Sequence, residues 1–229
     1  MKTDLKKQKQ FKKILSICIC IFILILLSIG DFAGKVSADI FNGPVFSKDG
    51  PEIVLKHCVN QSIAIINNPI YQGKSQEKIL LKTLFNKCES TFDFKTFSRG
   101  VLGRNWRRFS EKQREDFSKY FAHLIAQVYF SKLDRKSINN VSIHYIKTTM
   151  LPPTKSGIQR ADVTTEVIHS GKKTPVIYRM LKRKQGQWKI YDLKIEGVSL
   201  VSNYRAQYRN KFMETPEQII SELKKKVGK

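Results

Sequence analysis

The period of the apolar residues changes near residue 140 of this chain, and that change limits the fold class. Before it, apolar residues recur every three to four positions, as in amphipathic helices; after it, they alternate with polar residues, as in half-buried strands. From about residue 199 the helical spacing returns. This order predicts an α+β domain in which a four-stranded twisted antiparallel sheet packs against a mostly helical N-terminal half and C-terminal helices.

Capping residues predict where several helices begin and end. A first helix is expected between Asp49 and Asn67, and a second begins near Ser75. Asp93 is the expected N-cap of a short helix that closes at Gly103. Capping boxes predict two further helix starts, at Ser110–Gln113 and Thr215–Gln218.

Alternation predicts the strands, and glycines predict the turns between them. Gly171 and Gly186 mark hairpin turns, and Gly197 is expected to end the fourth strand. The four strands are expected around residues 141–145, 161–167, 176–180 and 188–195.

The N-terminus has the pattern of an export signal. Six lysines among the first thirteen residues precede an uncharged apolar run, Ile14–Ile29, of 16 residues. A straight membrane span needs about 20 residues, so a signal peptide is favoured over an uncleaved anchor. Val36-Ser37-Ala38 fits a signal-peptidase site, which predicts a signal segment 1–38, a single domain 39–229 and export to the periplasm.

The predicted mature chain is strongly basic. Removing the seven Lys and two acidic residues of 1–38 from the totals of 42 basic and 19 acidic residues leaves 35 and 17, a net charge of +18. This charge favours anionic partners such as phospholipid headgroups or acidic polymers. Export from the cytoplasm argues against nucleic acid as the anionic partner.

The residues that carry chemistry do not form a recognisable catalytic or metal-binding pattern. The four histidines are scattered without a second ligand at metal spacing, so no metal or cofactor is expected. Cys58 and Cys88 are the cysteines of the predicted mature chain, and an oxidising compartment would allow either a disulfide or two free thiols. An enzyme would need a buried carboxylate or histidine facing the apolar interior, for which Asp192 is the candidate; no enzymatic activity is expected.

Several segments together resemble the MlaC family of periplasmic phospholipid-binding auxiliaries of ABC transporters, also called toluene-tolerance proteins. No single motif is diagnostic, but their order and spacing are specific. The segments are Phe92-Asp93-Phe94, Leu102–Trp106, Ser110–Phe117 with Tyr129, Val176–Arg179, Trp188–Asp192 and Glu196–Arg205.

The resemblance implies that helices and sheet enclose a deep apolar pocket for the acyl chains of a phospholipid, which is cargo rather than cofactor. It also implies a carrier, expected to be a monomer, that shuttles phospholipid between an outer-membrane lipoprotein complex and an inner-membrane ABC transporter with a lipid-binding periplasmic subunit, and so maintains outer-membrane lipid asymmetry. Periodicity alone cannot distinguish such a pocket from a filled core.

We therefore expect a pocket lined by large apolar residues from both halves of the domain, with four arginines as candidates for contact with the headgroup or with a partner. The pocket residues are Phe97, Leu102, Phe117, Phe121, Ile125, Val141, Ile143, Val163, Val176, Tyr178, Ile190, Val198 and Val201. The arginines are Arg104, Arg107, Arg108 and Arg205. The alternatives are a carrier of a hopanoid or other polycyclic lipid, and a structural envelope protein that binds anionic polymers.

Overall fold

The computed structural model describes residues 49–130, 141–169 and 171–228. The predicted signal segment 1–38 lies outside these residues, so its cleavage stays a prediction. The helices are α2 (Pro51–Asn67), α3 (Glu77–Thr91), α4 (Phe94–Leu102), α5 (Glu111–Phe130), α7 (Leu200–Tyr208) and α8 (Pro216–Lys226), with short 3-10 turns η2 (Pro69–Tyr71), η3 (Lys74–Gln76) and η4 (Gly103–Arg108). The strands are β1 (Val141–Leu151), β2 (Gln159–His169), β3 (Lys172–Lys182), β4 (Lys189–Ile195) and β5 (Val198–Ser199).

The predicted caps are confirmed at three helix starts. The Asp93 carboxylate accepts a hydrogen bond of 2.8 Å from the Thr96 amide at the start of α4. Before α5, the Ser110 amide donates to Gln113 Oε1 at 2.7 Å, and the Gln113 amide donates back to Ser110 Oγ at 3.3 Å. Thr215 and Gln218 form the same reciprocal pair before α8. Each pair satisfies amide groups that a helix start leaves without intrahelical partners.

The sheet is an antiparallel meander in the order β1-β2-β3-β4-β5, so the prediction of four strands is corrected to five. The additional strand, β5, is two residues long and pairs with the end of β4. The turn between them has positive φ at both central residues, 49° at Glu196 and 82° at Gly197, as a type I′ hairpin turn requires. Gly197 therefore turns the chain back onto the sheet.

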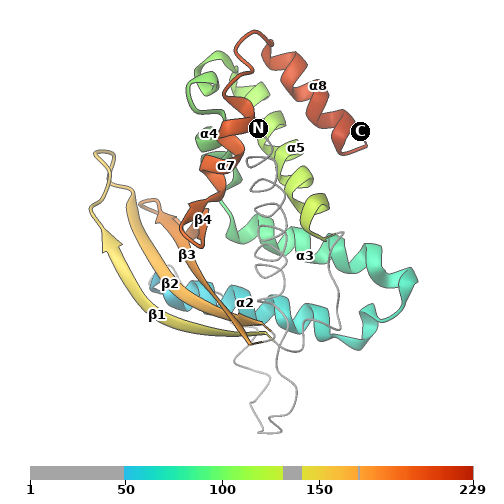
Figure 1. Ribbon diagram of the computed structural model, residues 1–229, viewed down its shortest axis with the longest axis vertical. Helices are drawn as coiled ribbons and strands as arrows, with labels where there is room; N and C mark the ends of the chain where they lie inside the picture. The colour runs from blue at the N-terminus through green and yellow to red at the C-terminus, as the bar shows by residue number, and fades with distance from the viewer. Residues whose placement is uncertain (1–48, 131–140, 170, 229) are drawn as a thin grey trace, which may run out of the picture.

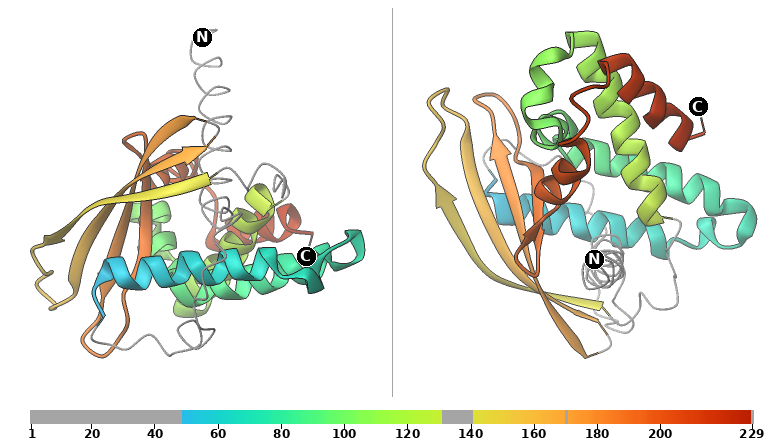
Figure 2. Two further views of the ribbon diagram at one scale, coloured as in Figure 1. Left: turned by 90° about the horizontal axis from the view of Figure 1, so that it is seen from below. Right: turned by 45° about the horizontal axis from the view of Figure 1, so that its top comes forward.

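The helices lie on the concave side of the curved sheet (Figure 1). α2 runs across that side, while α4, α5, α7 and α8 form a separate group beyond one end of the sheet (Figures 1 and 2). This layered arrangement confirms the predicted α+β class. Among the described residues, no helix combines the length and hydrophobicity needed to cross a bilayer.

One buried carboxylate joins the sheet to the C-terminal helices. The side chain of Asp192 on β4 is 1% exposed, and its Oδ1 accepts from the amides of Leu193 at 2.9 Å and Val201 at 3.1 Å. Its Oδ2 accepts from Ser199 Oγ at 2.7 Å and from Arg179 Nη1 at 3.4 Å. The negative charge thus lies at the positive N-terminus of α7, fixing the direction in which that helix leaves the sheet.

We expect Asp192→Asn to destabilise the fold by about 2 kcal/mol, because the new amide NH₂ group would face the Arg179 guanidinium and no negative charge would remain at α7. Thermal unfolding should show a melting temperature about 4–8 °C lower. Asp162→Asn is the matched control: Asp162 also faces Arg179, but at 3.7 Å and with its side chain 24% exposed. Equal losses in both variants would contradict the role assigned to Asp192.

Candidate functional site

The inner face of the central strands is uncharged and closed to solvent. β2 contributes Ala161, Val163, Thr165 and Val167, and β3 contributes Thr174, Val176, Tyr178 and Met180; each is 1% exposed or less. Val163 lies opposite Tyr178 in the register, and Thr165 lies opposite Val176. Because alternate residues of a strand point to the same face, these eight side chains form one continuous surface.

The flanking strands extend this surface. On β1, Ile143 lies opposite Val167 and Tyr145 lies opposite Thr165. On β4, Leu193 lies opposite Tyr178. We call this set of side chains, together with Val141 on β1 and Ile190 on β4, the inner face. Ile143 and Tyr145 are only partly buried, whereas Leu193 is 1% exposed. The inner face is therefore more open toward β1 than toward β4.

Helix α2 lies across the inner face and is fastened to it near β1 (Figure 2). Thr148 Oγ1 donates to Glu52 Oε2 at 2.8 Å, and the Lys56 ammonium lies 4.7 Å from the centroid of the Tyr145 ring. Hydrogen bonds from Lys56 and Thr148 lower the pKa of Glu52. The helix buries Val54, Leu55, Val59 and Ile66. Two apolar surfaces, one on the sheet and one on a helix, are thus held toward each other by polar contacts at their edge.

The few polar groups of the inner face remain neutral or are satisfied locally. Burial raises the pKa of the Tyr145 and Tyr178 phenols, which keeps both protonated. Thr165 Oγ1 donates to the Val176 carbonyl at 3.1 Å. Thr174 Oγ1 is buried without a hydrogen-bond partner among the described residues. Such a face can bind apolar groups.

The structure divides the predicted pocket residues into two groups. The first belongs to the inner face: Val141, Ile143, Val163, Val176, Tyr178 and Ile190. The second lies among the helices: Phe97, Leu102, Phe117, Phe121, Ile125 and Val201. Val198 is in neither group, because it lies on β5 and is 38% exposed.

Aromatic rings dominate the helical group. Phe121 lies 5.4 Å from Phe117 and 5.2 Å from Tyr204, measured between ring centroids. Tyr208 makes edge contacts with both phenylalanines, and Phe97 stacks on Phe121. Ring pairs at these separations are stabilised by dispersion and by the interaction of their quadrupoles. This group has the packing of a core between α4, α5 and α7.

Comparison with known proteins decides the family. A model of the MlaC protein family matches residues 56–225, more than half of the chain. The chain belongs to the MlaC family. Among solved structures, it resembles a phospholipid-binding protein from Ralstonia solanacearum in complex with a phospholipid, with a TM-score of 0.62 and 20% identity over 79% of this chain and 98% of that chain. Comparison with curated proteins finds no match.

Within this MlaC-family fold, two of the four candidate arginines bind backbone carbonyls. Arg108 donates through Nη1 to the Phe212 carbonyl and through Nη2 to the Glu214 carbonyl, both at 2.9 Å. Arg205 Nε donates to the Gly100 carbonyl at 2.6 Å and so joins α7 to α4. Arg104 and Arg107 are exposed on η4. Their contact with a headgroup or a partner stays a prediction.

Asp192 does not fit the catalytic role considered for it. Its neighbour Leu193 points to the inner face, so Asp192 points to the opposite face of the sheet, where it meets Arg179. The Cys58 thiol donates a hydrogen bond of 3.2 Å to Thr91 Oγ1, and burial raises its pKa, which disfavours a nucleophilic thiolate. The side chain of Cys88 lies outside the described residues, so the disulfide stays untested.

The surface hollow at the start of α4 lies apart from the predicted pocket residues. No group of His, Cys, Asp or Glu among the described residues could hold a metal ion. A surface hollow of about 500 Å³ lies at the start of α4, lined by Phe92, Asp93, Phe94, Lys95, Arg183 and Lys189. It contains none of the predicted pocket residues, and its cations include Arg183, which is paired with Asp93.

The two groups of predicted pocket residues should respond differently to truncation. We expect Phe121→Ala to destabilise the protein by about 3–5 kcal/mol, because the remaining rings cannot fill the space. Ile143→Ala, on the partly open side of the inner face, should cost about 1 kcal/mol or less. Urea unfolding followed by circular dichroism measures both. A loss below about 1 kcal/mol for Phe121→Ala would show that its side chain borders open space.

Proposed function

We propose that this protein binds the acyl chains of a phospholipid between the inner face and α2, and leaves the headgroup in solvent. The observation that carries the proposal is the inner face itself: eight adjacent uncharged side chains on β2 and β3, opposed by a helix that is fastened at one edge. Support also comes from the MlaC family and from the Ralstonia protein, which has this fold and was solved with a phospholipid.

Binding of this kind can be reversible despite the large apolar area. At about 0.8 kcal/mol per methylene, keeping two tails of about 16 methylenes out of water is favourable by about 25 kcal/mol in total. The relevant comparison is with the bilayer, where the tails are already dry. Transfer between bilayer and protein can therefore lie near zero in free energy, and the proteins that receive or supply the lipid can set the direction.

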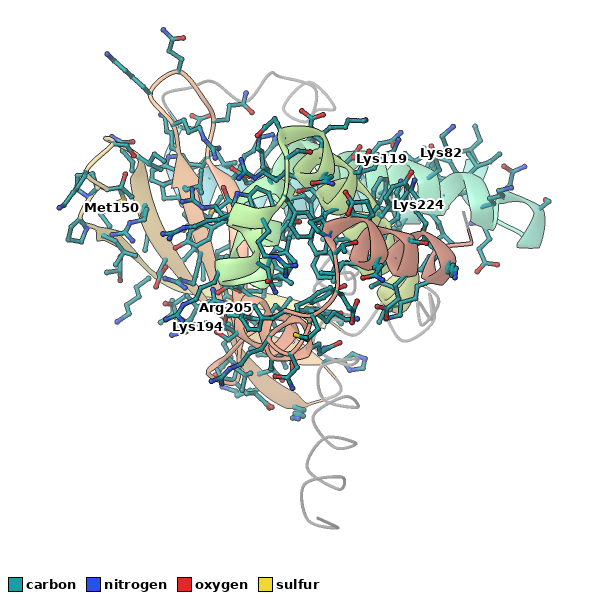
Figure 3. The ribbon with its side chains drawn as sticks, turned by 90° about the horizontal axis from the view of Figure 1, so that it is seen from above. Lys82, Lys119, Met150, Lys194, Arg205 and Lys224 are labelled. Atoms are coloured by element: carbon teal, nitrogen blue, oxygen red, sulfur yellow. The ribbon has the colours of Figure 1, made fainter. Side chains whose placement is uncertain are left out.

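We further propose that the protein acts in the periplasm as a shuttle. It would exchange phospholipid with an outer-membrane lipoprotein complex on one side, and with an inner-membrane ABC transporter carrying a lipid-binding periplasmic subunit on the other, thereby maintaining outer-membrane lipid asymmetry. The basic surface supports contact with anionic membranes or acidic partners. In Figure 3, exposed lysines from two different helices project from the protein: Lys82 on α3 and Lys119 on α5.

Native mass spectrometry of exported protein purified without detergent tests the cargo. We expect a discrete mass increment that lipid extraction identifies as a phospholipid. If the extracted lipid is a hopanoid or another polycyclic lipid, the protein is a carrier of that lipid class instead of phospholipid. A bare polypeptide mass, even after incubation with vesicles, would overturn the proposal and favour the structural envelope protein.

Val163→Gln tests the location of the cargo. It should abolish lipid co-purification and leave the circular dichroism spectrum largely unchanged, because a polar amide would have to be desolvated against the tails. Thr164→Gln is the matched control, since the neighbouring residue on β2 points to the outer face. Unchanged lipid in a folded Val163→Gln protein would remove the inner face as the binding site.

Deletion of the gene in the source organism tests the shuttle. We expect more phospholipid in the outer leaflet of the outer membrane, measured by labelling surface amines of intact cells with a membrane-impermeant reagent. The wild-type gene should restore the original labelling, and the Val163→Gln gene should not. Unchanged labelling after deletion would contradict a role in lipid asymmetry while leaving lipid binding intact.

A further inference from the structure

The connection between α7 and α8 carries two adjacent apolar side chains that project into solvent. Phe212 is 51% exposed and Met213 is 95% exposed. We call this pair the apolar tip. Among the described residues, Met213 is the most exposed of the large apolar side chains. Neither residue contributes to the core, so packing does not explain why apolar residues occupy these positions.

The backbone of the apolar tip is held on both sides of Met213. The guanidinium of Arg108 donates to the carbonyls of Phe212 and Glu214, each at 2.9 Å. The Lys211 ammonium binds both carboxylate oxygens of Glu214, at 2.7 and 2.9 Å, and also pairs with Glu222 on α8. A flexible loop could fold its apolar side chains back onto the protein. These contacts instead hold the tip in an outward position.

Exposed arginines lie on the two segments that adjoin the apolar tip, η4 and the end of α7. η4 and the end of α7 meet at this end of the molecule, where Asn105 Nδ2 donates to the Tyr208 carbonyl at 3.3 Å (Figure 1). Arg104, Arg107 and Arg209 are exposed, and within the described part of the chain none of them forms an ion pair with an acid. Among the acids on the same connection and on α8, Glu214 and Glu222 are paired with Lys211, and Glu217 accepts a hydrogen bond from Gln113, so three exposed arginines face one acid without an ion pair. The surroundings of the tip are therefore positive.

We infer that the apolar tip inserts into the interfacial region of an anionic lipid bilayer, with Arg104, Arg107 and Arg209 against the headgroups. Apolar side chains flanked by cations are the combination that holds peripheral proteins at such a surface. A stable protein interface would bury more than about 1,000 Å², far more than two projecting side chains provide. Each cation close to the leaflet strengthens the attraction about fivefold. The inference does not depend on the acyl-chain cargo, because the tip and the inner face share no residue.

Tryptophan quenching locates the point of insertion. The full gene carrying Met213→Trp is expressed, and the exported protein is mixed with vesicles of phosphatidylglycerol brominated near the top of its acyl chains. Bromine quenches only tryptophans that enter the bilayer, and the native Trp106 and Trp188 are buried. Ile70→Trp is the matched control: Ile70 lies on η2 and is 68% exposed, and the variant is expressed from the same full gene, so the two proteins differ only in the position of the added tryptophan.

We expect strong quenching for Met213→Trp and little for Ile70→Trp. In flotation assays, Phe212→Asp combined with Met213→Asp should weaken vesicle binding about tenfold or more, and raised salt should weaken binding of the wild type. Equal or absent quenching in the two tryptophan variants, or unchanged flotation of the double variant, would overturn the inference. If the double variant floats normally but loses lipid exchange with the transporter's periplasmic subunit, the tip contacts protein instead. The amount of co-purified lipid, measured in the same samples, tests separately whether the inner face binds cargo.

Discussion

The carboxylate of Asp192 fixes how the two parts of the fold meet. Its oxygens accept from the amide of Val201 in the first turn of α7 and from Arg179 on the neighbouring strand, so strand pairing and helix direction depend on one buried charge. α7 in turn places Tyr204 and Tyr208 against the rings of Phe117 and Phe121. The position of the helical group relative to the inner face therefore follows from a contact on the opposite side of the sheet.

The proposed cargo site would separate stability from binding. The ring cluster among α4, α5 and α7 packs as a core, whereas the proposed function gives the inner face the role of contacting the acyl chains. A carrier needs this separation, because a face that must release its cargo cannot also be the main source of folding energy. The more open side of the inner face, toward β1, is also where α2 is held by the Thr148–Glu52 hydrogen bond and by Lys56 over the Tyr145 ring.

Local chemistry explains which parts of the structure could be predicted from sequence. Caps depend on residues three positions apart, so Asp93, Ser110 and Thr215 could be identified directly. β5 could not, because two residues show no alternation and a non-glycine residue such as Glu196 rarely adopts positive φ. Periodicity also identified the apolar side of each element. It does not identify the neighbour that covers that side, so it does not distinguish residues packed against rings among the helices from residues of the inner face.

Arg108 illustrates the same limit and its functional consequence. Three arginines on one short segment look equivalent in sequence, since composition records only their charge. In the fold, Arg108 binds carbonyls more than 100 positions away and becomes a structural support, while Arg104 and Arg107 are exposed on η4. The planar guanidinium suits the first role because its fixed donors can bridge two carbonyls, which a lysine could not do with the same rigidity. One basic segment thus holds the backbone of the apolar tip through Arg108 and carries two further exposed arginines.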